Sequence, residues 1–326
     1  MIIDRRSMLA LAGASAAGHF LPGSAFAQTG PWPNKLIKAM VPFSAGSSVD
    51  VIGRIVLDEL SRRLGQSIVI ENRGGAGGTI GSAAVARAPA DGYTLLINAS
   101  AHSAAPAAYP RISYDPAKDF SSVISLGSIP NVVIVNPDKG YKTLQDLVER
   151  GRKQELFYSS AGVGSATHWA AERLRISSGI KGRHVPFRGG PAATLEVVAG
   201  RVDFACMGMS SALPLVSEGK VKALAVCTPK RSSAMPGLPT TTEAGFKDSD
   251  YTFWNAMFVK AGTPREIVDR LYRETTAVLA LPQVASKLKP QGVEPMDLTP
   301  PEFDALIAKE IALNKALVKA AGLKFN

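Results

Sequence analysis

The sequence predicts an α/β fold that consists of two units joined by crossing strands. Residues 36–98 alternate between short apolar runs and segments with helical spacing, an order that is typical of a parallel sheet with crossover helices. The same alternation restarts near Val132 and continues to Cys227. A chain of 326 residues is also long for one hydrophobic core and suits two domains of roughly 100–150 residues.

The first 27 residues have the pattern of a signal peptide. Arg5 and Arg6 precede a short run of apolar and small residues, Met8–Phe20, and the residues up to Ala27 then read small-x-small. The apolar run is shorter than the ~20 residues of a membrane-spanning helix. We expect residues 1–27 to be removed by cleavage after Ala27 during export. The paired arginines suggest the twin-arginine route, and the sequence leaves this route and the Sec route open.

Five elements are predicted for the first unit. After the first strand, apolar residues recur at helical spacing up to Leu64, and the turn Asp91-Gly92 precedes the third strand. The expected strands are Leu36–Phe43, Ser67–Glu71 and Tyr93–Asn98, and the expected helices are Asp50–Leu64 and Ile80–Arg87.

The second unit repeats this order, and a helical tail follows it. The expected strands are Val132–Asn136, Leu156–Ser159, His184–Phe187, Val202–Met207 and Val221–Cys227, and the expected helices are Leu144–Lys153, Ala166–Ser177, Ala192–Ala199 and Leu213–Glu218. In the tail, the segments beginning at Thr263 and Thr299 each predict a helix start, because threonine, proline and a glutamate three residues on resemble a capping box.

Two extended segments without helical spacing connect the units. They are Phe120–Pro130 and Asp248–Ala261, and we expect them to be crossing strands at a hinge. On this basis residues 28–127 and 250–326 form lobe 1, and residues 128–249 form lobe 2.

The charge and the cysteines give few constraints on function. A formal charge of +10 is compatible with a nucleic acid, an anionic membrane or an anionic solute as partner. The lysines and arginines are spread along the chain, and no nucleic-acid motif or zinc-ligand spacing accompanies them. We therefore expect no nucleic acid partner and no metal. Cys206 and Cys227 each lie in an apolar run, so a disulfide and two buried free thiols are both compatible with the sequence.

Two Gly/Ser-rich turns are the candidate binding elements. Phe43–Ser48 and Ser160–Ser165 each follow a predicted strand and lead into a predicted helix. The first N–H groups of a helix lack internal partners and, with the helix dipole, attract anions. Each turn by itself is equally compatible with an ordinary serine-capped helix. One such turn on each unit favours a site in which both units bind the same anion from opposite sides.

Enzyme alternatives have weaker support. Residues 75–81 read G-x-G-x-x-x-G, which departs from a dinucleotide fingerprint by one position. An exported α/β hydrolase would use Ser165 or Ser210 with His168, and Glu172 lies one helical turn from that histidine. A histidine that packs or hydrogen-bonds near the cleft is the simpler interpretation, and we expect no cofactor.

Over nearly its whole mature length the chain resembles the substrate-binding receptors of tripartite tricarboxylate transporters, the group named after the Bordetella uptake gene. The order and spacing of many short motifs carry the resemblance. They include Val41-Pro42-Phe43, Glu71-Asn72-Arg73, Gly75-Ala76-Gly77-Gly78, Ala90-Asp91-Gly92-Tyr93, Tyr114-Asp115-Pro116, Ser160-Ala161-Gly162, Val185-Pro186-Phe187, Gly200-Arg201-Val202-Asp203, Leu238-Pro239-Thr240 and Ala261-Gly262-Thr263-Pro264.

The resemblance implies a periplasmic binding protein of the type II-like, Venus flytrap kind, with two lobes and crossing hinge strands. It implies a monomeric, non-catalytic receptor that captures a small carboxylate for uptake through a membrane permease. The binding positions that it implies are Phe43, Ser44, Ala45, Gly46, Ser47 and Asp50 in the first turn, Ser160, Ala161, Gly162, Gly164, Ser165 and His168 in the second, and Phe187 and Asp203 facing the cleft.

The chain departs from the family pattern in two places. Ser47 stands where a second glycine is usual, which puts the identity of the ligand in doubt. Phe187-Arg188 stands where Tyr-Lys is common. Arg188 either clamps a carboxylate with two hydrogen bonds or is a solvated surface arginine.

Overall fold

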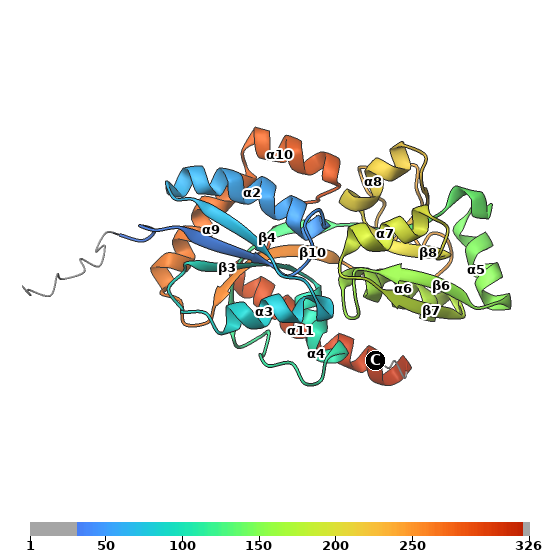
Figure 1. Cartoon of the computed structure of the whole chain (residues 1–326), viewed down its shortest axis with the longest axis horizontal. Helices are drawn as coiled ribbons and strands as arrows, with labels where there is room; N and C mark the ends of the chain where they lie inside the picture. The colour runs from blue at the N-terminus through green and yellow to red at the C-terminus, as the bar shows by residue number, and fades with distance from the viewer. Residues whose placement is uncertain (1–30, 322–326) are drawn as a thin grey trace, which may run out of the picture. The chain divides into compact units, whose positions relative to one another are not determined.

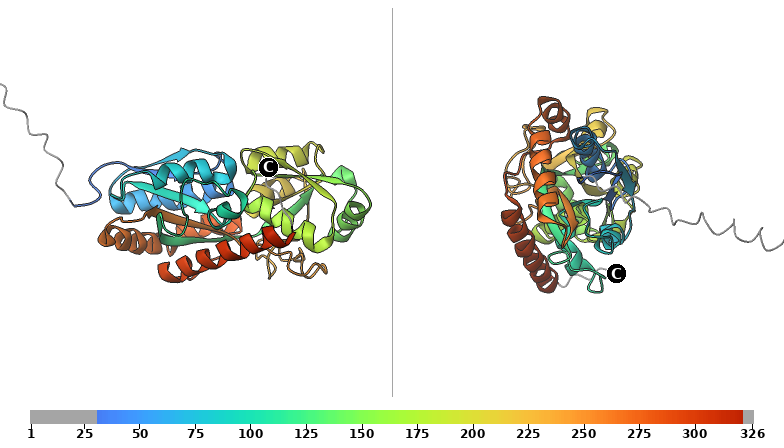
Figure 2. Two further views of the ribbon diagram at one scale, coloured as in Figure 1. Left: turned by 90° about the horizontal axis from the view of Figure 1, so that it is seen from below. Right: turned by 90° about the vertical axis from the view of Figure 1, so that its left-hand side faces the viewer.

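The computed structural model describes residues 31–321, and it places helices on both faces of two five-stranded sheets (Figures 1 and 2). The predicted signal peptide, residues 1–27, lies outside the described residues. From Lys35 onward the chain forms one compact unit, which contains both sheets. Among the described helices, none has the length and apolar character to cross a membrane.

The first sheet has the strand order β2-β1-β3-β10-β4. Strand β1 pairs in parallel with β2 and β3, whereas β10 lies antiparallel to β3 and β4. The strands are β1 (Ile37–Val41), β2 (Ile68–Asn72), β3 (Thr94–Ala99), β4 (Phe120–Ile129) and β10 (Phe253–Lys260). Their helices are α2 (Ser48–Leu64), α3 (Thr79–Ala86), α4 (Ala101–Ala108), α9 (Arg265–Leu279), α10 (Pro282–Leu288) and α11 (Pro300–Ala321), with short 3-10 turns η1 (Ala76–Gly78) and η3 (Lys289–Gln291). We call this sheet and its helices the first lobe.

The second sheet, with its helices, forms the second lobe and has the order β7-β6-β8-β5-β9. Strand β6 is parallel to β7 and β8, and β5 is antiparallel to β8 and β9. The strands are β5 (Asn131–Val135), β6 (Leu156–Ser160), β7 (Gly182–Pro186), β8 (Phe204–Gly208) and β9 (Lys222–Val226). The helices are α5 (Leu144–Lys153), α6 (Ala166–Ser178), α7 (Gly190–Val198) and α8 (Met209–Ser217), with the 3-10 turn η2 (Pro137–Lys139).

The chain crosses between the lobes twice. Strand β4 leads through Pro130 directly into β5, and residues 227–252 return the chain from β9 to β10. Strands β4 and β10 are antiparallel neighbours, so the two crossings lie side by side. This arrangement confirms the predicted α/β fold with two lobes and crossing hinge strands. The residue boundaries predicted for the lobes stay a prediction.

Each lobe has its own hydrophobic core. In the first lobe, Trp254 and Phe258 of β10 pack against Phe303 of α11 and are almost inaccessible to solvent. In the second lobe, Trp169 and Phe204 are fully buried. Because aromatic side chains bury large apolar areas, these clusters hold the helices against the sheets.

Three local features differ from the sequence-based expectations. Helices α4 and α10 were not predicted, because they are short and their composition gives weak helical periodicity. The capping box expected before α9 is not formed: the Thr263 hydroxyl donates to the carbonyl oxygen of Lys260, and Pro264 precedes the first helical residue without a side-chain cap. At α11, the Glu302 carboxylate does accept hydrogen bonds from Thr299.

Candidate ligand-binding site

The two Gly/Ser turns end in serine caps with the same geometry. The Ser47 hydroxyl accepts a hydrogen bond from the backbone N–H of Asp50 at 3.4 Å, at the start of α2. The Ser165 hydroxyl accepts one from the backbone N–H of His168 at 3.3 Å, at the start of α6. Both predicted turns therefore lead into serine-capped helices, one in each lobe.

The third residue of each helix also braces the turn that precedes it. The Asp50 carboxylate accepts from the Gly46 N–H at 2.9 Å, and the His168 Nδ1 atom accepts from the Gly164 N–H at 3.0 Å. Both glycines have positive φ, 75° and 72°, which is the left-handed region that favours glycine. The two turns thus share one design, with a carboxylate as brace in the first lobe and an imidazole in the second.

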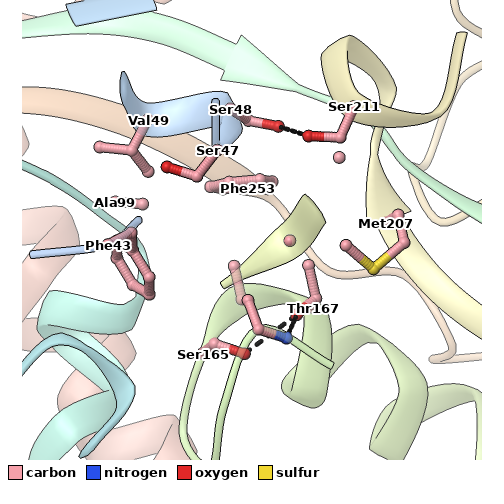
Figure 3. Close-up of a pocket in the computed structure, with 14 residues that line it drawn as sticks. Phe43, Ser47, Ser48, Val49, Ala99, Ser165, Thr167, Met207, Ser211 and Phe253 are labelled. Carbon is pink, nitrogen blue, oxygen red and sulfur yellow. Dashed lines mark hydrogen bonds between the residues drawn. The ribbon is translucent and has the colours of Figure 1, made fainter. Parts of the chain in front are cut away.

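These helix N-termini meet at a pocket between the lobes, which we call the inner pocket (Figure 3). Its lining includes the capping serine and the first two residues of both helices: Ser47, Ser48 and Val49 of α2, and Ser165, Ala166 and Thr167 of α6. The rest of the lining is Phe43, Ala99 and Phe253 from the first lobe and Ala161, Gly190, Met207, Gly208 and Ser211 from the second. None of these lining residues carries a charge, so the helix N-termini supply the positive potential of the inner pocket.

The lobes touch around the inner pocket. The Ser48 and Ser211 hydroxyl oxygens are 3.1 Å apart across it, and the Tyr109 hydroxyl donates to the Val163 carbonyl oxygen at 2.9 Å. The volume open to the centre of a water molecule is about 30 Å³, which is room for about two water molecules. The structure therefore shows a closed arrangement that leaves little space between the two helix N-termini.

Asp50 is buried, yet it remains ionised. Burial by itself raises the pKa of this carboxyl, but hydrogen bonds from Arg54, the Gly46 N–H and Asn72 outweigh burial and lower the pKa below its usual value. The Arg54 guanidinium lies 2.9 Å from the Asp50 carboxylate and balances its charge. The first helix N-terminus can therefore attract an anion in spite of the nearby carboxylate.

His168 is neutral and lies behind the second turn. Its ring stacks on His184 with the ring centroids 3.8 Å apart, and the His184 Nε2 atom is 2.6 Å from the Ser160 hydroxyl oxygen. Burial lowers the pKa of both imidazoles to about 3, helped at His168 by the nearby Arg175 and at His184 by His168. Only an uncharged His168 can accept the Gly164 N–H at Nδ1, so the neutral form holds the turn.

The structure brings only part of the predicted binding residues to the inner pocket. Phe43, Ser47, Ala161 and Ser165 line it. Gly162 and Phe187 line a neighbouring hollow that shares Ala161 with the inner pocket. The remaining predicted turn residues lie around these linings. Ser44 packs closely against Gly189 of the second lobe, Ala45 and Gly46 are exposed, and Ser160 is buried against His184. Asp50, Gly164 and His168 form the hydrogen bonds of the turns.

Asp203 does not face the cleft. It precedes β8, whereas Gly208 at the other end of this strand lines the inner pocket. At the usual rise of a strand, about 16 Å separates the two residues. The Asp203 carboxylate instead forms an ion pair with Lys139 at 2.8 Å and accepts from the Phe157 N–H. It joins the beginnings of β6 and β8, at the end of the sheet that faces away from the other lobe.

The hydrolase alternative has no support in the geometry. The Ser165 hydroxyl is used as a helix cap and lies 3.0 Å from the Thr167 hydroxyl, while the His168 Nδ1 atom is occupied by Gly164. With its lowered pKa, His168 is a very weak base near neutral pH. The Ser210 hydroxyl is buried without a hydrogen-bond partner among the described residues.

The glycines of residues 75–81 serve close packing instead of a dinucleotide. A Cβ on Gly77 would lie 2.1 Å from the Val163 carbonyl oxygen, and a Cβ on Gly81 would lie 2.8 Å from Pro42.

In the described part of the chain, no three His, Cys, Asp or Glu side chains lie close enough together to hold a metal ion. Cys206 and Cys227 are buried free thiols with their sulfur atoms 4.0 Å apart.

Sequence reasoning missed more than half of the pocket lining. Ser48 ends the predicted turn Phe43–Ser48 but was not among the binding positions that the resemblance implies. Val49 lay next to this turn, and α2 begins at Ser48, two residues before the predicted helix start at Asp50. Ser211 and Phe253 had no local signal. They reach the pocket only because β8 ends, and β10 begins, beside the two turns.

A family model and several solved structures match this chain. The family model described as the tripartite tricarboxylate transporter family receptor matches residues 52–323. The solved structure of the periplasmic binding protein BugD is 31% identical, covers 90% of this chain and 99% of its own, and superposes with a TM-score of 0.86.

Two solved structures from Rhodopseudomonas palustris contain ligands. MatC with bound malate is 31% identical, covers 88% of this chain and 100% of its own, and has a TM-score of 0.83. A second protein, solved with adipate, is 32% identical, covers 90% of this chain and 99% of its own, and has a TM-score of 0.86.

Proposed function

Because the chain belongs to the tripartite tricarboxylate transporter receptor family, we propose that it is a periplasmic, non-catalytic receptor whose lobes close on a small carboxylate. One observation carries the proposal. The N-termini of α2 and α6, on different lobes, line the same inner pocket. Only the closed state offers a ligand both termini, so binding shifts the hinge equilibrium toward closure.

The free N–H groups at both helix starts recognise the ligand. In any α-helix the first N–H groups lack an intrahelical acceptor and favour an anion. We assign ligand contacts to Phe43, Ser47, Ala161 and Ser165 from the predicted set, and we add Ser48, Thr167 and Ser211, which line the pocket and carry hydroxyl groups. Asp50 and His168 act through the turns that they brace.

The size and the walls of the inner pocket favour a short acid. Phe43, Met207 and Phe253 form apolar walls, and the enclosed volume is small when the lobes touch. Relatives with bound malate and bound adipate support a carboxylate as the ligand class. Any dicarboxylate needs more room than this small volume, so the lobes must move apart slightly around the ligand. We propose that this receptor prefers acids of malate length over adipate, because a longer ligand would separate the lobes further and lose more contacts such as Ser48–Ser211.

A thermal-shift screen tests the proposal. The panel contains acetate, malonate, malate, citrate and adipate, with malamide as a matched uncharged control for malate. A ligand that binds only the folded protein raises the unfolding temperature in a concentration-dependent manner. We expect a rise with at least one carboxylate and none with malamide, and recovery of the ligand with unchanged mass. A panel without any response, or an equal response to malamide, refutes carboxylate recognition.

Export, oligomeric state and partner complete the proposal. We propose cleavage after Ala27, a monomer in solution, and delivery of the ligand to a membrane permease. Intact-mass measurement of the periplasmic form tests the cleavage site, and light scattering tests the monomer. Replacing Arg5 and Arg6 with lysine should stop export by the twin-arginine route and leave export by the Sec route intact. Loss of carboxylate uptake in cells that lack the receptor tests the link to a permease.

A further inference from the structure

Four exposed arginines line a groove at the edge of the lobe interface that consists of two neighbouring hollows. Its first part lies between α3 and the segment that follows α4, and Arg73, Arg87 and Arg111 belong to its lining. Its second part lies between the lobes and includes Arg188 of the second lobe. We call the two parts together the arginine groove.

The arginine groove lies beside the inner pocket. Its two parts share Tyr109, which extends from the first lobe to hydrogen-bond Val163 of the second. The second part shares Ala161 with the inner pocket. The arginine groove therefore borders the turn at Ala161, which precedes α6 and also lines the inner pocket.

The positive charge of the arginine groove is not balanced by nearby carboxylates. Neither part of the groove is lined by an aspartate or a glutamate. Within residues 31–321, none of the four arginines lies within ion-pair distance of a carboxylate, and Arg87 donates only to the Ser113 hydroxyl. Most other exposed arginines in this part of the chain, such as Arg62 and Arg265, do have such a partner.

Closure adds to this positive potential. The Arg188 carbonyl oxygen lies 3.3 Å from the place that a Cβ on Gly74 would occupy, so the backbone next to Arg73 meets Arg188 when the lobes touch. Closing the lobes thus brings the backbone segments that carry Arg73 and Arg188 together at the groove. An anion at this position is attracted by arginines of both lobes.

We propose that the arginine groove is a capture site for the anionic ligand, which binds there transiently before it moves into the inner pocket. This inference rests on the proposed carboxylate-binding function. Clefts lined by charges of one sign raise the local concentration and the association rate of oppositely charged solutes. The effect falls with salt, because the screening length is about 8 Å at physiological ionic strength.

Stopped-flow measurement of association tests the capture site. Malate and adipate are mixed separately with the full mature receptor, and the fluorescence of its buried tryptophans reports closure. The variant carries Arg73→Gln, Arg111→Gln and Arg188→Gln. The control variant carries Lys142→Gln, Lys153→Gln and Lys181→Gln, which remove the same charge from exposed positions at the far end of the second sheet.

We expect the association rate constant of the arginine variant to fall roughly tenfold at low salt and to differ little from wild type at high salt. The lysine variant should associate as the wild type does, and dissociation rates should stay within about twofold. An unchanged association rate, or an equal loss in the lysine variant, overturns the capture site. A faster dissociation with unchanged association also overturns it, because it would make Arg188 part of the final clamp.

The two proposals fail in different ways. If the wild type gives no thermal or fluorescence response to any carboxylate, the proposed function fails and the groove has no ligand to capture. If the wild type responds and the arginine variant associates at the same rate, only the capture site fails.

Discussion

Replacing Gly77 with alanine should disfavour closure while it leaves both lobes folded. A Cβ at this position would lie 2.1 Å from the Val163 carbonyl oxygen on the other lobe, well inside contact distance. Within its own lobe, the nearest neighbour would be the Tyr109 ring at 3.1 Å, a tight contact that a small shift can relieve. The clash therefore falls mainly on the closed state.

Gly65 provides a matched control in the same lobe. Its φ of 67° is close to the 62° of Gly77, but a Cβ there would have no heavy atom within 4 Å. Alanine in the left-handed region costs about 1–2 kcal/mol at either site, and this lowers the unfolding temperature of both variants alike. Only Gly77→Ala carries the additional clash, which should cost about 1–3 kcal/mol in the closed state.

Calorimetric titration with malate and adipate measures the difference. The additional cost predicts that Gly77→Ala binds roughly 5- to 150-fold more weakly than Gly65→Ala, whose affinity should match the wild type. Equal affinities of the two variants would mean that the ligand-bound state does not bring Gly77 against Val163. The closed arrangement described above would then not be the binding state.

Four other predictions address the interface, the turns, the histidines and the thiols. Tyr109→Phe removes the hydrogen bond to the second lobe, which should weaken carboxylate binding by about 1 kcal/mol without lowering the stability of the empty protein, as titration and thermal unfolding can show. Asp50→Asn should destabilise by about 1.5–3 kcal/mol in chemical denaturation, whereas Asp58→Asn, which breaks only an exposed ion pair on the same helix, should cost less than about 1 kcal/mol. Burial lowers the pKa of the three described histidines to about 3 or 4. Below pH ~6.5 the unfolded chain therefore binds more protons than the folded protein, and the free energy of unfolding should fall as the pH drops from 7 to 5. NMR should show the imidazoles of the folded protein still neutral at pH 5. Cys206 and Cys227 should react with a thiol reagent only after unfolding, and rapid labelling of the native protein would contradict their burial.

Much of the fold was predictable because its signals are local. The expected helix Leu144–Lys153 coincides with α5, and its Thr143 cap is present. Helical periodicity, capping residues and glycines at positive φ depend on neighbours within a few positions along the chain. The same holds for both binding turns, whose serine caps and bracing residues lie within four positions of each other.

The candidate site was predictable only in part. The positions taken from the resemblance to the receptor family include Phe43 and Ser165, which line the inner pocket, and Asp203, which lies at the opposite end of its strand. The motif that contains Asp203 does not tell which end of β8 faces the other lobe. Nor does it tell that this carboxylate joins β8 to β6. His168 was the strongest candidate base by sequence, yet burial makes it a neutral brace.

The sequence by itself determined the α/β order, the two helix N-termini and the family, because these depend on short-range patterns and on motifs in a fixed order. Tertiary structure decided where the two turns meet, how little space they enclose and which arginines remain unpaired beside them. The physical reason is the hinge. The contacts Ser48–Ser211 and Tyr109–Val163 join residues far apart in the chain, and they form only when the two crossing strands let the lobes close.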